Sequence, residues 1–147
     1  MDILRIMIGA LVGTTMMTIF SYLISIAFQK LYKEPVLLKY ILLKSGADLT
    51  KKQTATAGWI VHYLMGVVFI VIYHFLWKSD VVALTWLNGL YLGIGSGIVG
   101  ILGWIVMFKV SNFKSDIGFT GYFSQLLIAH IIFALSAVAV YKFLFEC

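Results

Sequence analysis

Residues 119–145 read FTGYFSQLLIAHIIFALSAVAVYKFLF, an apolar run that contains no proline, aspartate or glutamate. A helix that crosses the hydrocarbon core of a bilayer needs about 20 mostly apolar residues, and this run exceeds that length. Lipid cannot hydrogen-bond backbone groups, so a segment inside it must satisfy those groups internally, as a helix does. The run therefore predicts a transmembrane α-helix.

Three earlier stretches, at residues 3–28, 56–77 and 82–108, have similar length and apolar character. The whole 147-residue chain is 62% hydrophobic and only 12% charged, which an ordinary soluble domain could not bury. Arg5 before the first run resembles the start of a signal peptide, but the run is too long and no small-residue cleavage site follows. We predict an all-α integral membrane protein, a single four-transmembrane-helix bundle over residues 1–147.

Lysines are concentrated in the first and third connections between these spans. Those connections carry eight lysines, whereas the other side has only Arg5, Lys78 and Lys142. Because cytoplasmic loops are enriched in Lys and Arg, the lysine-rich side is predicted to be cytoplasmic, with both termini outside. Membrane topology thus accounts for the basic charge. We expect the lipid bilayer as a partner, no nucleic acid, and a bacterial inner membrane as the location.

The first connection contains a helical pattern of its own. Residues 35–45 read PVLLKYILLKS, where Pro35 suits a first helical turn and Gly46 suits a helix end. Eleven residues are too few to span a bilayer. We predict a short interfacial helix between the first and second spans, with Lys39 and Lys44 directed at lipid head groups. A docking surface for a partner is the alternative interpretation.

Three further signals mark where helices begin. Thr50 and Gln53 have the spacing of a capping box, which would start the second span. Asp80 can cap the third span after a connection of about four residues, which makes the second and third spans antiparallel neighbours. Ser115 or Asp116 can start the fourth span.

Small residues at four-residue spacing predict where the spans touch, because transmembrane helices associate through close backbone contact. Gly89, Gly93 and Gly97 form such a row on the third span, and Gly9 and Gly13 form one on the first. The third span is therefore predicted to be the central, tightly packed helix.

A stripe of hydroxyl side chains continues along the first span. Thr14, Thr18, Ser21 and Ser25 stay on one side of a helix with 3.6 residues per turn. Such hydroxyls either bond their own backbone at a packing interface or line a path for a substrate, and both interpretations stay open.

Histidines are the candidates for chemistry inside the spans, where ionisable residues are costly and often functional. His62 shares a helix face with Gly58 and Gly66, so it should face another helix. His130 lies near the middle of the last span, within roughly 5 Å of the depth of His62 at 1.5 Å per residue. His74 lies near the outer boundary and is predicted to be an interfacial histidine.

Three interpretations of His62 and His130 remain. Each could donate an N–H group to a hydroxyl or carbonyl group of a neighbouring helix and only stabilise the bundle. The two could be axial ligands of a b-type haem, which would make them the metal site. They could also form a polar ligand-binding or proton-linked pocket with Gln125, Tyr63 and the hydroxyls of Thr14 and Thr18.

Acidic residues are predicted to lie outside the bundle, at the termini or in loops: Asp2, Glu34, Asp48, Asp80, Asp116 and Glu146. An acid-free interior lacks the groups for paired-carboxylate catalysis or a carboxylate proton relay. Cys147 is the only cysteine, which excludes an internal disulfide and a Cys-built zinc site.

These observations favour a non-enzymatic protein, either an accessory subunit or a small-ligand-binding bundle, in a homo-oligomer or a larger membrane complex. The first alternative is an electron-transfer subunit that holds haem b on His62 and His130. The second is a small oligomeric transporter whose Thr and Ser stripe lines the path.

Overall fold

The computed structural model describes residues 1–46, 48–112 and 118–145. It contains five helices, and no strand occurs within these ranges. The helices are α1 (Asp2–Phe28), α2 (Glu34–Lys44), α3 (Lys51–Lys78), α4 (Trp86–Val110) and α5 (Phe119–Phe145). All but α2 are long and apolar enough to cross a membrane, so the chain is a multi-pass membrane protein built as a four-helix bundle.

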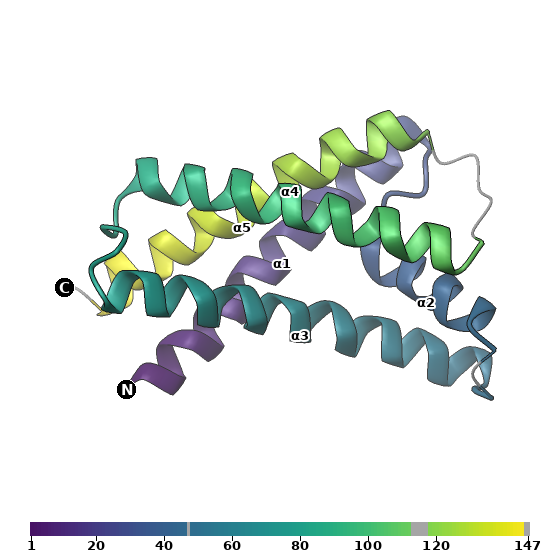
Figure 1. Cartoon of the computed structure of the whole chain (residues 1–147), viewed down its shortest axis with the longest axis horizontal. Helices are drawn as coiled ribbons and strands as arrows, with labels where there is room; N and C mark the ends of the chain where they lie inside the picture. Colours follow the sequence, from purple (N-terminus) through teal and green to yellow (C-terminus); the bar gives the residue numbers. More distant parts are fainter. Residues whose placement is uncertain (47, 113–117, 146–147) are drawn as a thin grey trace.

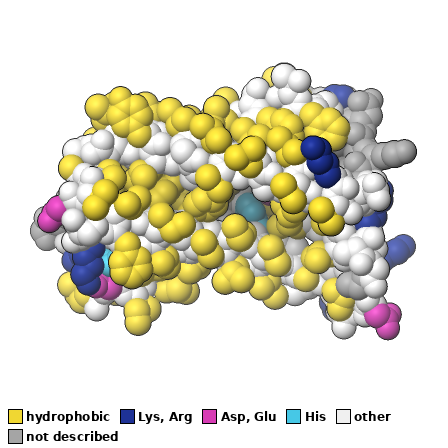
Figure 2. Space-filling view, in the orientation of Figure 1, with side chains coloured by type: hydrophobic (Ala, Val, Ile, Leu, Met, Phe, Trp, Pro, Cys, Tyr) yellow, Lys and Arg dark blue, Asp and Glu magenta, His cyan; other side chains and the backbone are white. Residues whose placement is uncertain are grey.

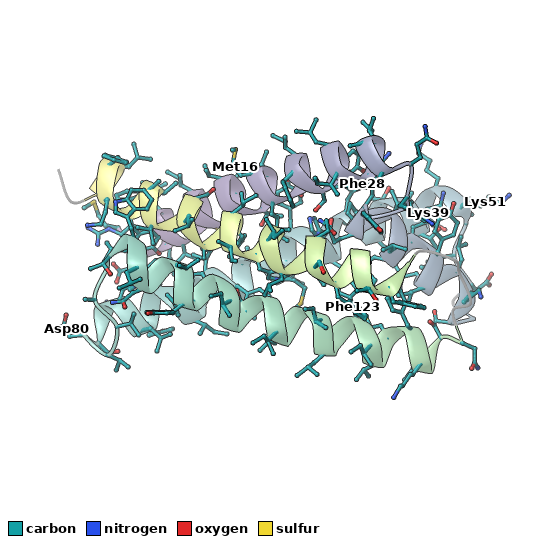
Figure 3. The ribbon with its side chains drawn as sticks, turned by 90° about the horizontal axis from the view of Figure 1, so that it is seen from above. Met16, Phe28, Lys39, Lys51, Asp80 and Phe123 are labelled. Atoms are coloured by element: carbon teal, nitrogen blue, oxygen red, sulfur yellow. The ribbon has the colours of Figure 1, made fainter. Side chains whose placement is uncertain are left out.

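The four long helices run along the long axis, and both termini lie at the end opposite α2 (Figure 1). Lys39 and Lys51 mark one end of the bundle and Asp80 marks the other (Figure 3). Charged side chains gather at the two ends, and hydrophobic side chains cover the middle of the face shown in Figure 2. This distribution matches a lipid core between two aqueous interfaces.

The capping box at the start of α3 is confirmed. Thr50 Oγ1 accepts a hydrogen bond from the backbone N–H of Gln53 at 3.2 Å, and Gln53 Oε1 accepts one from the backbone N–H of Thr50 at 2.8 Å. These reciprocal bonds satisfy two N–H groups that a helix start leaves free. They extend the helix to Lys51, ahead of the apolar run that begins at residue 56.

The predicted start of the third span is wrong. Asp80 has φ 54° and terminates the turn after α3, so it cannot also cap α4. Thr85 caps α4 instead, accepting from the backbone N–H of Asn88 at 3.2 Å. The span thus begins at Trp86, four residues later than predicted. The predicted start of the fourth span at Ser115 or Asp116 lies outside the described residues.

The short helix between the first two spans is present as α2, but its first turn lies inside the bundle. Glu34, Pro35, Leu37 and Leu38 are buried, whereas Lys44 is exposed. A Cβ atom at Gly58 of α3 would lie 2.5 Å from the carbonyl oxygen of Pro35. The glycine therefore lets α2 press its backbone against α3, so a buried first turn anchors the interfacial helix.

The central helix is α5, not the glycine-rich α4. It packs extensively on both α1 and α4, whereas α4 packs mainly on α5. The glycine row of α4 faces α5, where a Cβ atom at Gly93 would lie 2.6 Å from the Cα atom of Ile131. On α1, Gly9 faces Tyr141 and Gly13 faces Phe133 of the same central helix. The glycine rows therefore lie on the two helices that pack against the central helix, α1 and α4, and not on the central helix α5.

Candidate functional site

A cavity of about 200 Å³ lies inside the bundle, and all five helices contribute to its lining. Most of the lining is apolar, and its ionisable members are Glu34, His62 and His130. Figure 2 shows a hollow in the middle of the apolar face with a histidine side chain at its floor. The cavity therefore combines an apolar wall with a few polar groups, as ligand pockets usually do.

The hollow exists because α3 and α4, although consecutive, pack little on each other. The Tyr73 hydroxyl ties them together, lying 2.7 Å from Ser96 Oγ and 3.1 Å from the carbonyl oxygen of Leu92. Elsewhere between these helices the cavity is lined by Gly100 and Gly103 of α4. A Cβ atom at Gly103 would meet nothing within 4 Å, so the missing side chain leaves space.

Glu34 overturns the prediction of an acid-free interior. The sequence placed it in a loop, but it is buried with 2% of its surface exposed. After α1 the chain folds back, because Ser25 Oγ donates to the carbonyl oxygen of Lys30 and accepts from the backbone N–H of Tyr32. This tight return brings the start of α2, and Glu34 with it, into the bundle.

Hydrogen-bond donors from two distant helices hold the Glu34 carboxyl group. Its Oε1 atom accepts from Ser21 Oγ of α1 at 2.8 Å and from Gln125 Nε2 of α5 at 3.3 Å. Its Oε2 atom is buried without a hydrogen-bond partner among the described residues. Burial raises the pKa of Glu34 from its ordinary value of 4.5 to about 7, and these hydrogen bonds oppose the rise.

The hydrogen bonds of the two histidines define which ring nitrogens are free. Thr18 donates its hydroxyl proton to the carbonyl oxygen of Thr14 at 2.6 Å, so His62 Nε2 must donate to Thr18 Oγ1 at 2.8 Å. His130 Nδ1 lies 2.8 Å from the carbonyl oxygen of Leu126, which can only accept. In the neutral rings, His62 Nδ1 and His130 Nε2 are therefore acceptors.

The structure brings two residues of the predicted polar pocket, His62 and His130, together in the cavity lining. Gln125, Thr14 and Thr18 are not part of that lining: Gln125 holds Glu34, Thr18 accepts a hydrogen bond from His62, and Thr14 contributes its backbone carbonyl oxygen to Thr18. Tyr63 also lies apart from the cavity. Its hydroxyl lies 3.1 Å from Thr15 Oγ1, in a separate groove between α1 and α3.

The two histidines differ in whether their Nε2 atom is free to bind a haem iron. His130 Nε2 is the nitrogen that a haem iron would need, and its Nδ1 is held by a carbonyl group as in many ligating histidines. His62 Nε2, however, is already bonded to Thr18. Within the described ranges, no group of three or more His, Cys, Asp or Glu side chains could hold a metal ion.

His74 lies at the other end of the bundle and points inward, with 5% of its surface exposed. Its Nδ1 atom lies 3.1 Å from the Tyr141 hydroxyl, and its Nε2 atom lies 3.7 Å from Asp2 Oδ2. Lys78 Nζ contacts the same Asp2 oxygen at 2.5 Å. His74 thus joins α1, α3 and α5 near their outer ends and does not line the cavity.

Glu34 lies outside the four spans, so their apolar patterns give no sign that it is buried. One signal could have found it: Glu34 begins a helix whose next residues, Pro35 to Leu38, are apolar. Ser21 lies in the C-terminal part of α1 and Gln125 in the N-terminal part of α5, and both contact the first residue of α2. Polar side chains inside a membrane bundle need a polar partner, and for Ser21 and Gln125 that partner is Glu34.

The chain matches no protein-family model, and it has no significant match among curated proteins or solved structures.

Proposed function

We propose that the protein is a non-enzymatic, small-ligand-binding membrane protein that takes its ligand from the surrounding lipid into the central cavity. The observation that supports this proposal is the cavity of about 200 Å³ with its apolar wall and three ionisable side chains. Apolar cavities of roughly 150 Å³ already bind a benzene molecule. The space therefore suits a group about the size of one ring, and a longer ligand would extend into lipid.

The loose packing of α3 on α4 supports a lateral entrance between these two helices. The hollow lies in the hydrophobic face between the charged ends (Figure 2). Val99 and Gly103 of α4 line the cavity and are also exposed on the outside of the bundle. A ligand dissolved in the bilayer would thus reach the cavity without crossing the head-group region.

Trp104 is a natural reporter for this proposal, because it lines the cavity and only 6% of its surface is exposed. We would replace the other three tryptophans, Trp59, Trp77 and Trp86, with phenylalanine and place the protein in lipid nanodiscs. Bromobenzene, a membrane-soluble quencher of one-ring size, should then quench Trp104 fluorescence in a saturable manner. A variant that keeps the exposed Trp86 alone should show only linear quenching by partition into lipid.

Two glycines of α4 provide a matched pair of variants. Neither Gly95 nor Gly103 has a neighbour within 4 Å of an added Cβ atom, but only Gly103 lines the cavity. Gly103→Phe should fill the cavity and abolish saturable quenching, whereas Gly95→Phe should leave it unchanged. Equal behaviour of the two variants, or no saturable quenching at Trp104, would overturn the proposal.

One observation favours a second candidate, the b-haem electron-transfer subunit: His130 has a free Nε2 atom beside the cavity. The bond between His62 and Thr18 argues against the pair of ligands that this function needs. A haem band in the absorption spectrum of the purified protein, lost in His130→Ala, would support this candidate.

The orientation and location complete the proposal. The end that carries α2 and the lysine-rich connections faces the cytoplasm of a bacterial inner membrane, with both termini outside. The uneven division of lysines supports this orientation.

A further inference from the structure

Three buried polar atoms around Glu34 have no hydrogen-bond partner among the described residues: Glu34 Oε2, Gln125 Oε1 and the Tyr122 hydroxyl. Unpaired buried polar groups are rare in folded proteins, and each needs an explanation. Glu34 also lines the cavity. Its Oε2 atom is therefore a buried acidic oxygen without a protein partner among the described residues.

Hydrogen bonds and the position of Glu34 in its helix favour the ionised form of the carboxyl group, whereas burial opposes it. Ser21, Gln125 and the backbone N–H of Glu34 all donate to it, and each hydrogen bond lowers its pKa. Glu34 is also the first residue of α2, where the helix dipole stabilises a negative charge. Burial opposes these effects and raises the pKa to about 7. The carboxyl group can thus exchange its proton near neutral pH.

No lysine or arginine among the described residues forms an ion pair with this carboxylate. Lys and Arg are absent from the described cavity lining, although buried charges normally need a partner of opposite sign. Lys33 precedes Glu34 in sequence, but its Nζ atom lies over the Tyr22 ring, 4.7 Å from the ring centroid. A cationic ligand would supply the positive charge that no lysine or arginine of the described lining provides.

The rest of the lining suits an organic cation. Phe69, Trp104 and Phe133 place aromatic rings at the cavity, and aromatic faces attract ammonium groups. Met17, Met65 and Met107 add flexible, polarisable thioethers. A ligand with a carboxylate group, by contrast, would be repelled by ionised Glu34, and the described lining has no lysine or arginine to bind it.

We propose that the ligand is a lipophilic organic cation, a quaternary or protonated amine with an apolar group about the size of one ring, which pairs with Glu34 Oε2. This inference rests on the proposed ligand-binding function. When the cation binds, the O–H bond of protonated Glu34 breaks, the proton leaves to bulk water, and the carboxylate pairs with the cation. Binding of the cation and of the proton to Glu34 is therefore competitive.

Other groups that face Glu34 must be separated from it in a pH experiment. Tyr22 of α1 and Tyr122 of α5 lie close enough for the charge of Glu34 to act on them, but tyrosines ordinarily titrate near pH 10. His62 of α3 and His130 of α5 line the same cavity and belong to a residue type that titrates near neutral pH. The described cavity lining from α4 has no ionisable side chain.

The test uses the full chain in nanodiscs and two probes of the same shape. Benzyltrimethylammonium, labelled with tritium, carries the cation, and neopentylbenzene replaces its nitrogen with carbon. We expect the affinity for the cation to rise about tenfold per pH unit below pH 7 and to level off above it, as one-proton competition requires. Neopentylbenzene should compete at least tenfold less well at pH 8 than unlabelled cation does.

Variants assign the effect to Glu34. Glu34→Gln should lower the affinity for the cation at least tenfold at pH 8 while keeping saturable bromobenzene quenching of Trp104. His62→Gln and His130→Gln should each keep the pH profile. Affinity independent of pH in the unmodified protein, equal competition by neopentylbenzene, or undiminished cation binding in Glu34→Gln would overturn this inference and leave the cavity proposal standing. Absence of saturable quenching in the protein that keeps Trp104 alone would instead overturn the cavity proposal.

Discussion

Gln125 donates a hydrogen bond to Ser21 at 2.5 Å, although 104 positions separate the two residues in the sequence. Both side chains also donate to Oε1 of Glu34. A polar network thus links α1, α5 and the start of α2 inside a bundle that is otherwise mostly apolar. In a membrane protein such a network has to be satisfied internally, yet Glu34 Oε2 has no hydrogen-bond partner among the described residues.

Glu34→Gln should make stability less dependent on pH. Because the pKa of Glu34 rises from 4.5 to about 7 on folding, the unfolded chain loses this proton first, and stability falls as pH increases through that window. Above pH 7, the ionisation of buried Glu34 lowers the free energy of unfolding by about 3 kcal/mol at most. Thermal unfolding in detergent should show the variant more stable than the unmodified protein at pH 8. Asp48→Asn, at an exposed loop position, should show no such gain.

Ser21→Ala should shift the pH dependence of cation binding. Removing a donor to Oε1 makes the carboxylate harder to form, so the midpoint of the pH profile should move to higher pH. The affinity for benzyltrimethylammonium at pH 7 should fall severalfold and recover as pH rises. Ser124→Ala is the control, because Ser124 is exposed and its hydroxyl donates to the carbonyl oxygen of Thr120 in the same helix. An unchanged midpoint in Ser21→Ala would show that Ser21 does not tune Glu34.

Gly93→Ala should destabilise the contact between α4 and α5. A Cβ atom there would lie 2.6 Å from the Cα atom of Ile131, and backbone cannot move aside as a flexible side chain does. We expect a loss of about 2 kcal/mol, in the range of overpacking in a tight interface. Gly95→Ala, on the same helix but with open space around it, should be neutral or stabilising through helix propensity. Reversible unfolding in mixed micelles would compare the two variants.

The proposed orientation can be checked with single cysteines. In a Cys147→Ser background, Asp80→Cys tests the connection between α3 and α4, and Leu49→Cys tests the connection between α2 and α3. Both positions are exposed. A membrane-impermeant maleimide should label residue 80 in intact cells and residue 49 only after permeabilisation. The reverse pattern would invert the topology.

Local chemistry explains the parts of the fold that could be predicted. A helix in lipid depends on the apolar character of its own residues, so the span over 119–145 was predicted with the bounds that α5 has. The capping box of Thr50 and Gln53 involves atoms only three residues apart. Asp80 shows the limit of such signals, because a good capping residue was available but Thr85 took the role.

The sequence by itself determined that the chain forms four membrane-spanning helices and a short fifth one, because the lack of backbone hydrogen bonding in lipid acts on each segment separately. It also singled out His62 and His130. Only the tertiary structure decided that α5 is central, that α3 and α4 part to leave a cavity, and that Glu34 is buried in its wall. The physical reason is that burial of a side chain depends on which helices pack around it. For Glu34, those are helices whose contacting residues, Ser21 and Gln125, lie 13 and 91 positions away.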